Sequence, residues 1–450
     1  MSQRTFAGLL VLLSGTVVCT SAQSPVSLRV KTRSVVATGP SEHLLYEPNL
    51  AADPTTPGRW LAASIVRGSA PKYPDSEKDQ TCAAFVSNDD GKSWSRHDFP
   101  VTGCYDPWTA ITPDGRFLVS VIAASADFPQ QGDSGLLIFR SDDGGRTWLD
   151  HPVGLGRGND HTVMVVDLTA SAHRGWIYIS SHKGTRADDG MRRYGPWLAR
   201  SRDGGKTFDD PVMTVPNNLH NLAEMPAVLS DGTLVESFVD AGYVRAGSDG
   251  EAGFASRRGW VVRSTDGGHT FSVPLFVNDA CGPPPGFRLS ALAVDASSGA
   301  YRDRLYFACR GTGGGAIVVN TSQDRGETWT SPVALPAAQD APRPEERIPA
   351  LAVNRDGVVA AAWIDGNSKP GHLCEQSVFV TASADGGATW SAPVRVSSTP
   401  ACPDGTRVAS STGGDYFGLA AGADGGFRIL WSEMHDGASD LVTATVAVVR

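Results

Sequence analysis

Seven charged residues take equivalent places in this chain of 450 residues, each at the opening of an otherwise apolar stretch. They are Glu47, Asp106, Asp160, Glu224, Arg288, Arg347 and Asp415. Charged side chains are rarely buried without a partner or a function. Carboxylates can donate and accept protons, and the planar fork of arginine binds a carboxylate through two hydrogen bonds. The set therefore predicts either a functional site or a mutually paired ring of charges that lines a wet central channel.

The elements that must position these residues follow from a repeated phrase. Each of the seven residues opens two apolar runs around a turn, as in the stretch EMPAVLSDGTLVESFVD that begins at Glu224. Such a pattern is typical of a β-hairpin, and further apolar runs supply a third and a fourth strand. Four antiparallel strands in roughly 60 residues make one blade of a β-propeller. The sequence predicts an all-β, seven-bladed propeller, and a six-bladed ring is the alternative.

The two ends of the chain are expected to meet in one blade. The seventh phrase, from Asp415, is followed by the apolar run LVTATVAVV, which would be its third strand. We expect the fourth strand to be SLRVKTRSVV, which begins at Ser27. Such a clasp leaves the ring no open sheet edge.

A second repeat, which we call the box, follows the third strand of six blades. It reads Ser-x-Asp-x-Gly-x-(Thr/Ser)-(Trp/Phe) and begins at Ser87, Ser141, Ser201, Ser264, Ser322 and Ser383, 54 to 63 residues apart. Gly supplies the positive φ of a tight turn, and the Ser and Asp side chains can bond the N–H groups of the turn. The aromatic residue can then bury between neighbouring blades. A calcium loop needs further carboxylates, so we expect the boxes to stabilise the fold and to bind no metal.

Composition and the N-terminal residues limit the location and the partners. The net charge is −9 and no run of Lys and Arg occurs, which argues against a nucleic-acid partner. Arg4, an apolar run over 6–18 and small residues after it predict a secretory signal peptide over 1–22, followed by a single propeller domain over 23–450. A lipoprotein anchored at Cys19 is the alternative. The apolar run is too short to span a bilayer, so we expect a secreted or periplasmic protein without a membrane span.

Six cysteines remain after residue 22, an even number in a chain that we expect to be exported. They fall in three close pairs along the sequence. The pairs predict three disulfides: Cys82–Cys104, Cys281–Cys309 and Cys374–Cys402. Buried free thiols are the alternative.

The six boxes resemble the Asp boxes, or bacterial neuraminidase repeats, of the sialidase superfamily, and the resemblance covers nearly all of the expected mature chain. It implies that the boxes lie on the face opposite the active site, which sits where the innermost strands begin. It also implies a tyrosine nucleophile activated by a glutamate, arginines that hold the substrate carboxylate, and an aspartate that acts as general acid and base.

Three segments extend this resemblance to individual catalytic residues. DYFGLAAGADGGFRILWSE is similar to the tyrosine-bearing segment of the family and makes Tyr416 the candidate nucleophile. AEMPAVLSDGTL is similar to the segment of the paired glutamate and makes Glu224 the candidate base. The family's acid lies on a loop after the second strand of the first blade, where KYPDSEKD offers both Asp75 and Asp79.

The arginines match the family in part. ERIPALAV resembles its Arg-Ile-Pro motif and makes Arg347 a candidate ligand of an anionic substrate group, and Arg288 and Arg310 are candidates to complete the cluster. The motif belongs in the first blade of the family, where this chain has Glu47. A glutamate there would repel a sialic acid carboxylate. In the family an arginine also ends the strand after the paired glutamate, where this chain has Asp240.

Other residues near the ring have two possible roles. Four aromatic residues could stack on sugar faces or pack between blades: Tyr105, Trp108, Tyr194 and Trp197. Asp160, His161 and His182 could together bind a metal. No further ligand follows at a recognisable spacing, and we expect neither a metal nor a cofactor.

The sequence therefore predicts a secreted, sialidase-like glycoside hydrolase that acts on a glycan or glycoconjugate, as an exo-α-sialidase or a related exo-glycosidase. Tyr416 and Glu224 are its expected catalytic centre. The charged residues Glu47, Asp106, Asp160 and Asp415 are expected to line the substrate site beside the arginines. The alternative is a non-catalytic propeller that binds a glycan or a protein partner on the same face.

Overall fold

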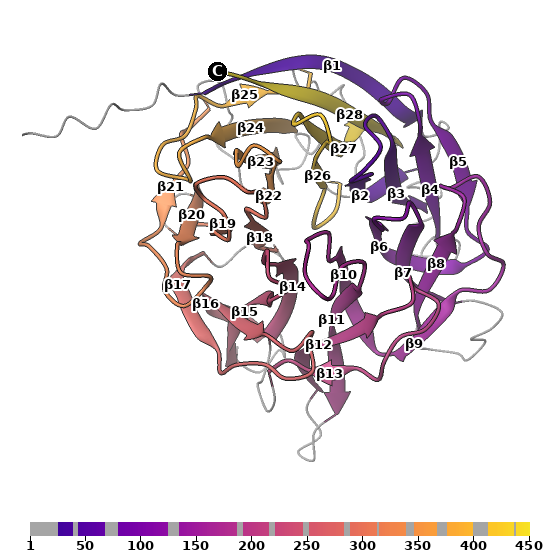
Figure 1. Ribbon diagram of the computed structural model, residues 1–450, viewed down its shortest axis with the longest axis horizontal. Helices are drawn as coiled ribbons and strands as arrows, with labels where there is room; N and C mark the ends of the chain where they lie inside the picture. Colours follow the sequence, from indigo (N-terminus) through magenta and orange to yellow (C-terminus); the bar gives the residue numbers. More distant parts are fainter. Residues whose placement is uncertain are drawn as a thin grey trace, which may run out of the picture.

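The computed structural model describes residues 26–38, 44–67, 80–124, 135–186, 192–215, 221–245, 252–282, 289–312, 315–338, 346–366, 376–398, 413–435 and 438–450. These residues form seven sheets, each of four antiparallel strands, and they contain no helix. The sheets are blades around a central axis, with β2, β6, β10, β14, β18, β22 and β26 innermost (Figure 1). The predicted seven-bladed propeller is confirmed, and the six-bladed alternative is wrong.

The strands follow one another from the centre outward in six of the blades. Blade 1 holds β2 (Leu44–Ala52), β3 (Trp60–Arg67), β4 (Thr81–Ser87) and β5 (Ser95–Asp98); blade 2 holds β6 (Thr102–Ile111), β7 (Phe117–Ala124), β8 (Gly135–Ser141) and β9 (Val153–Arg157). Blade 3 holds β10 (Asn159–Val166), β11 (Ile177–Arg186), β12 (Arg192–Ser201) and β13 (Val212–Met213); blade 4 holds β14 (Asn221–Val228), β15 (Leu234–Arg245), β16 (Ala252–Ser264) and β17 (Leu275–Cys281). Blade 5 holds β18 (Ala291–Val294), β19 (Leu305–Arg310), β20 (Ile317–Ser322) and β21 (Val333–Ala334); blade 6 holds β22 (Glu346–Val353), β23 (Val359–Gly366), β24 (Ser377–Ser383) and β25 (Val394–Arg395).

Blade 7 joins the two ends of the chain. It consists of β26 (Gly418–Ala421), β27 (Phe427–His435), β28 (Ala438–Val449) and, outermost, β1 (Ser27–Thr38). The register runs from Ser27 opposite Val449 to Thr38 opposite Asp440. The expected clasp is therefore confirmed, and β1 lies along β28 at the rim of the ring (Figure 1).

The boxes close their turns with one repeated set of hydrogen bonds. In the first box, the Gly91 N–H donates to Ser87 Oγ at 2.8 Å, while the N–H and hydroxyl of Ser93 donate to the Asp89 carboxylate at 2.9 and 2.6 Å. The other five boxes repeat these three bonds. The fifth residue, always Gly, has φ between 74° and 93°. The predicted turn chemistry is confirmed.

Neighbouring blades are tied to one another beside these turns. Trp148, the aromatic residue of the second box, packs in the apolar cluster between blades 1 and 2, with its ring 5.2 Å from that of Phe99. The buried Arg428 of blade 7 reaches the first box, where it donates to Asp90 at 2.8 Å, and its guanidinium lies 4.7 Å from the ring centre of Trp60. The boxes therefore hold the ring together, as expected.

The boxes and the charged residues lie at opposite ends of the blades. In blade 1, Ser87 of the box pairs with Trp60, and Trp60 pairs with Ala52 at the end of β2. Tyr46, near the start of β2, pairs with Ile65 at the other end of the sheet. We call the end that carries the boxes the box face, and the end where the innermost strands begin the mouth face.

Two disulfides join neighbouring blades near the mouth face. Cys82 of β4 is bonded to Cys104 of β6, and Cys281 of β17 is bonded to Cys309 of β19. These bonds confirm two of the three predicted pairs. Cys374 and Cys402 lie outside the described residues, as does the expected signal peptide over 1–22.

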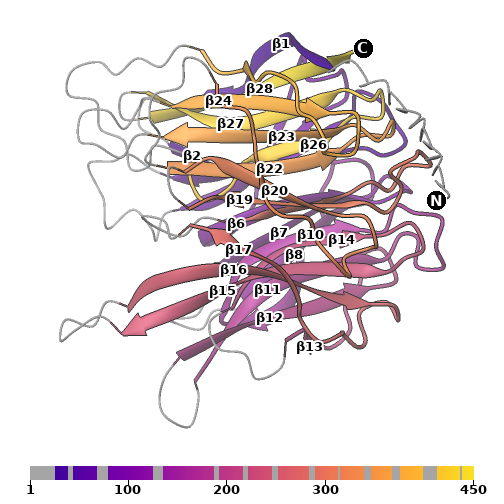
Figure 2. The same ribbon diagram turned by 90° about the vertical axis from the view of Figure 1, so that its left-hand side faces the viewer.

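The hairpin of β15 and β16 projects beyond the other strands (Figure 2). Asp240 of β15 already pairs with Asn221 at the start of β14, so the pairs from Tyr243 to Arg245 extend past the innermost strand on the mouth face. In the described part of the chain, no helix is long and apolar enough to cross a membrane.

Candidate functional site at the mouth face

Four innermost strands break their regular pairing where they enter the mouth face, and in β14 the register shifts between Ala223 and Pro226. The register shifts between Tyr46 and Asn49 in β2, between Tyr105 and Trp108 in β6, and between Asp160 and Thr162 in β10. The residues in these irregularities with left-handed backbones are Glu47 (φ 48°), Asp106 (φ 49°) and His161 (φ 48°). Non-glycine residues rarely adopt this conformation, and such strain is concentrated at functional sites.

The left-handed residues build a chain of hydrogen bonds from one blade to the next. The Glu47 N–H donates to the carbonyl of Gly413 in blade 7 at 2.8 Å. The Asp106 N–H donates to the Glu47 carboxyl group, and the His161 N–H donates to Asp106 Oδ2 at 2.9 Å. Each of these residues therefore turns its N–H toward the preceding blade. We call this series, which crosses blades 7, 1, 2 and 3, the inter-blade N–H chain.

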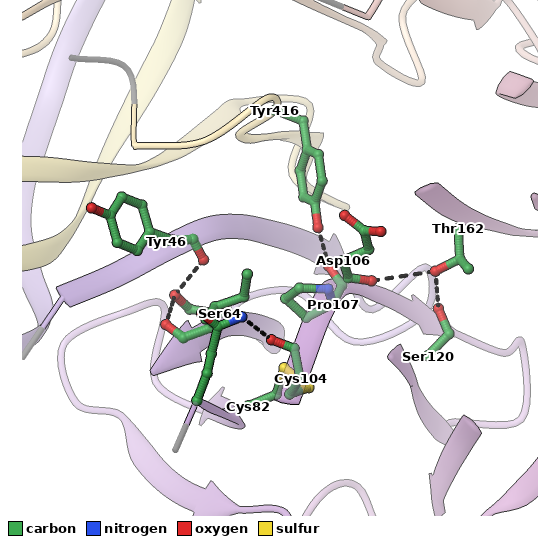
Figure 3. Close-up of a disulfide and its surroundings, with 11 residues drawn as sticks. Tyr46, Ser64, Cys82, Cys104, Asp106, Pro107, Ser120, Thr162 and Tyr416 are labelled. Carbon is green, nitrogen blue, oxygen red and sulfur yellow. Dashed lines mark hydrogen bonds between the residues drawn. A yellow bond between two sulfur atoms is a disulfide. The ribbon is translucent and has the colours of Figure 1, made fainter. Parts of the chain in front are cut away.

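Tyr416 stands directly beside this chain, in the segment that leads into β26. Its hydroxyl donates to the carbonyl of Pro107 at 3.2 Å and lies next to Asp106 (Figure 3). Its ring centre is 5.4 Å from that of Trp108 and 5.8 Å from that of His161. The residue is only 3% exposed. Burial raises the pKa of Tyr416 well above its ordinary value, and the charges of nearby carboxylates raise it further.

A glycine allows this segment to approach the first blade. Gly414 has φ 120°, and a Cβ atom added to it would collide with the side chain of Glu47. Glu47, Asp106 and Asp415 are the carboxylates that act on the Tyr416 hydroxyl. Because Gly414 has no side chain, Tyr416 and these carboxylates can share one small volume.

The carboxyl groups of the mouth have pKa values displaced in both directions. Burial raises the pKa of Glu47 well above its usual range, and the charges of Asp106 and Asp415 add to this effect. Burial and the charge of Asp160 raise the pKa of Asp106 to about 7, although the N–H of His161 favours its ionised form. Burial therefore favours the protonated form of Glu47, and Asp106 is close to the midpoint of its titration at neutral pH.

Asp160 differs from its two neighbours. Its carboxylate Oδ2 lies 3.1 Å from His182 Nε2. Desolvation acts to raise the pKa of Asp160, but the hydrogen bond and charge of His182 lower it below its ordinary value. Asp160 is therefore ionised at neutral pH, at an exposed position on the rim. Among the described residues, no group of three or more His, Cys, Asp or Glu is arranged to hold a metal ion.

The structure brings together five of the residues singled out in the sequence. They are Glu47, Asp106, Asp160, Asp415 and Tyr416, from blades 1, 2, 3 and 7. Arg310 ends β19 in blade 5. Glu224 lies in β14 and Arg347 in β22, but their side chains lie outside the described part of the chain. Asp75, Asp79 and Arg288 also lie outside the described residues. Their proposed roles stay predictions.

Two of the four aromatic candidates are packing residues. Trp108 is 7% exposed and its indole N–H donates to the carbonyl of Met164, and Trp197 is 1% exposed in the same apolar cluster. Tyr105 is half-buried, and the side chain of Tyr194 is not described. Trp108 and Trp197 therefore belong to the apolar cluster that also contains Tyr416.

The sequence indicates His161 only as a possible metal ligand, whereas in the structure it takes the left-handed position in blade 3 that Glu47 and Asp106 take in blades 1 and 2. The pattern of charged residues places Asp160 at that position instead. The number of residues between the left-handed position and the apolar part of the strand is the signal that could have identified His161. Sequence reasoning missed the glycines at 413 and 414, whose pairing with Glu47 has no local signature.

No protein-family model matches the chain, and no curated protein matches its sequence. A solved protein of unknown function from Dyadobacter fermentans aligns with a TM-score of 0.50 at 13% identity, over 94% of this chain and 99% of that one. The NanB sialidase of Streptococcus pneumoniae aligns at 0.49 and 10% identity, over 93% and 99%. An α-L-arabinofuranosidase from Fusarium graminearum aligns at 0.49 and 13%, over 79% and 98%. The alignment with the Dyadobacter fermentans protein shows that the two chains share a fold and nothing more.

Proposed function

We propose that this protein is a glycoside hydrolase that acts at the mouth face, with Tyr416 as its nucleophile and Asp106 as the base that accepts the phenolic proton. The observation that carries the proposal is the position of the Tyr416 hydroxyl beside Asp106 and Glu47, on a backbone that is strained at both carboxylates. Glu224 remains the alternative base from the resemblance.

The protonation of the site favours this assignment. A phenol is a poor nucleophile unless an adjacent base takes its proton, and burial keeps Tyr416 protonated. Asp106 titrates at about 7, and a base is most effective when its pKa lies close to the working pH. As the bond forms between Tyr416 and the anomeric carbon, its proton passes to Asp106. The leaving oxygen takes a proton from an acid, for which Glu47, Asp75 and Asp79 are candidates.

The charge of the mouth suits the transition state of glycoside cleavage. Positive charge develops on the sugar ring during this reaction, and ionised carboxylates fixed nearby stabilise it. Asp160 is ionised at neutral pH, and Asp106 is partly so. The same charges repel an anionic sugar, so we place an uncharged glycosyl group before sialic acid as the substrate. Arg347, Arg288 and Arg310 remain candidates for holding an anionic group elsewhere on a glycoconjugate.

The two disulfides bear on location. Disulfides form and persist in oxidising compartments, and here they join blades 1 and 2 and blades 4 and 5. We therefore propose a secreted or periplasmic protein, in line with the predicted signal peptide over 1–22.

One observation favours a second candidate, a non-catalytic propeller that binds a glycan or a protein at the same mouth. Tyr416 is 3% exposed and its hydroxyl is already bonded to Pro107, so in this state the nucleophile is covered. A catalytic role requires that a substrate displace this bond. A binding protein would need no such change.

The test is a panel of fluorogenic glycosides that includes uncharged sugars and a sialoside, incubated with the purified protein. We expect turnover of an uncharged member, reduced at least about a hundredfold in Tyr416→Phe and Asp106→Asn. Asp142→Asn, the same change at an exposed carboxylate of the second box, is the matched control and should keep full activity. A loss in Glu224→Gln with full activity in Asp106→Asn would move the base to Glu224. No turnover, with glycan binding on an array, would leave only the binding protein.

A further inference from the structure

In the inter-blade N–H chain, His161 acts through its main-chain N–H group and not through its imidazole. In an extended strand, successive N–H groups point into the sheet ladder, whereas a left-handed residue at an irregularity redirects the chain and its N–H group. His161 has φ 48°, and its N–H leaves the sheet of blade 3 to reach Asp106 of blade 2 at 2.9 Å. The next residue, Thr162, donates its hydroxyl to the Asp106 carbonyl at 3.3 Å. The irregularity in β10 therefore holds Asp106 by both its side chain and its main chain.

We propose that His161 is a positioning residue for Asp106, and that it acts through its left-handed main chain rather than through its ring. This inference rests on the proposed function, in which Asp106 is the base for Tyr416. The ring of His161 is buried and lies 5.8 Å from the ring of Tyr416 and 6.3 Å from that of Trp108. Its charge acts on the neighbouring Asp160, whereas Asp106 receives the main-chain N–H.

Several titratable groups face Asp106 from the elements packed around it. Glu47 faces it from β2, Asp415 and Tyr416 from the segment before β26, and Asp160 with its partner His182 from β10 and β11. The charges of Asp160 and Asp415 oppose ionisation of Asp106, whereas the hydrogen bond from the Glu47 carboxyl group and the N–H of His161 favour it. Loss of this N–H bond should therefore raise the titration midpoint of Asp106. A hydrogen bond to an ionised group is strong enough to account for a rise of about one pH unit or more.

The experiment separates the main chain of His161 from its ring. His161→Gly and His161→Asn remove the imidazole but accept a left-handed backbone, whereas His161→Ala and His161→Val oppose it. The midpoint is read from the carboxyl carbon resonance of Asp106 in the full-length protein, assigned by its absence in Asp106→Asn. We expect the Gly and Asn variants to stay within a few tenths of a pH unit of the parent, and the Ala and Val variants to rise by about one unit.

Arg325→Ala is the matched control, because it places Ala at another left-handed position, φ 65°, on the box face and does not touch the mouth. It should leave the Asp106 midpoint unchanged. A rise of equal size in the Gly and Ala variants would show that the ring sets the midpoint and would overturn the proposal. Midpoints that stay unchanged in folded Ala and Val variants would overturn it as well. If Ala and Val do not fold, a shift in both Gly and Asn still overturns it, and unchanged midpoints in both support it.

The titration needs no substrate, so its outcome is independent of turnover. A protein that cleaves no glycoside but shows the expected shifts would lose the proposed function and keep the positioning of Asp106. An active protein whose pH profile shifts toward alkaline pH in His161→Ala, and not in His161→Gly, would support both.

Discussion

The box face and the mouth face use the same interaction with opposite results. On the box face, the carboxylates of Asp89 and Asp203 accept main-chain N–H bonds, and their pKa values fall to about 2. On the mouth face, Asp106 also accepts a main-chain N–H bond, yet its pKa rises to about 7. The difference lies in the surroundings. The box carboxylates stand near solvent among donors, whereas Asp106 is desolvated among other carboxylates.

The backbone shows the same contrast. The fourth residue of each box is left-handed, and in four of the six boxes it is Gly, which adopts this conformation without strain. At the mouth the left-handed positions belong to Glu47, Asp106 and His161. The left-handed turns of the box face therefore carry little conformational strain, whereas the left-handed residues of the mouth face are strained. A strained and desolvated set of carboxylates opposes folding, which is typical of a site maintained for function.

The largest expected effect comes from one substitution made on both faces. Asp106→Asn should lower turnover of the responsive glycoside at least about a hundredfold, because the base is lost. It should leave the free energy of unfolding at pH 8 unchanged or higher, because a buried charge is removed. Asp203→Asn should keep full activity and lower the free energy of unfolding by about 1 kcal/mol. The Asn oxygen can keep the main-chain N–H bonds, but the NH2 group that replaces Oδ2 cannot accept the hydroxyl bond of Thr207. Kinetic assays and urea titrations check both. Equal losses of stability would contradict the contrast between the faces.

The second prediction concerns the covalent ties of the mouth face. Cys82 and Cys104 are 22 residues apart in sequence, and Cys281 and Cys309 are 28 apart. Closing loops of this length stabilises a protein by about 3 kcal/mol. The double variant Cys82→Ala with Cys104→Ala should lower the free energy of unfolding by about that amount, measured in urea without reductant. Adding reductant to the parent should lower it further, because both bonds are lost. A parent that is equally stable with and without reductant would show that the mouth needs no covalent support.

The third prediction uses pH. The box carboxylates have lowered pKa values, so the stability they contribute is complete above about pH 4 and is lost as pH falls through about 2. Asp106 and the buried Glu236, which accepts a hydrogen bond from Ser180, have pKa values raised to about 7. Between the ordinary and raised values the folded state binds more protons than the unfolded state. The free energy of unfolding should therefore fall as pH rises from about 4.5 to about 7, with a maximum near pH 4 to 5.

Glu236→Gln isolates one of these groups in the body of the propeller, between blades 3 and 4. Burial is the main cause of its raised pKa. The variant should gain about 2 kcal/mol of stability at pH 8 and none at pH 4.5, where the parent side chain is already neutral. Thermal unfolding at the two pH values is the measurement. An equal change at both would mean that packing, and not charge, determines the effect.

The parts of the fold that recur along the chain could be predicted from the sequence. The blade number follows from seven phrases, the turn chemistry from the residues of the box, and the clasp from the unmatched runs at Ser27 and in LVTATVAVV. The disulfides Cys82–Cys104 and Cys281–Cys309 followed from close pairs in sequence. Each of these features is local or repeated, so a single sequence contains enough information to infer it.

Several residues of the mouth face could be predicted from the sequence, but the contacts among them could not. Glu47, Asp106 and Tyr416 follow from the sequence, but the closeness of Tyr416 to Glu47, Asp106 and Asp415 does not. The pairing of Tyr416 with Glu224 stays a prediction. The hydroxyl of Tyr416 bonds Pro107, which lies 309 residues away in sequence. No pattern within a blade reports contacts between the seventh blade and the second. The left-handed position of His161 was missed for the same reason, because the partner of its N–H is in another blade.

The smallest expected effect tests whether the left-handed backbone of the box face carries as little conformational strain as the contrast between the faces requires. Arg325 takes the fourth position of the fifth box, where four other boxes have Gly, and it forms ion pairs with Asp231 and Asp303. Arg325→Gly should relieve about 1 kcal/mol of strain, and it should lose partly exposed ion pairs that contribute about 1 kcal/mol. The two effects nearly cancel, so the urea midpoint should hardly move. A destabilisation of more than about 2 kcal/mol would mean that this box depends on Arg325 for more than its conformation, and that the box face also carries strained residues for a purpose.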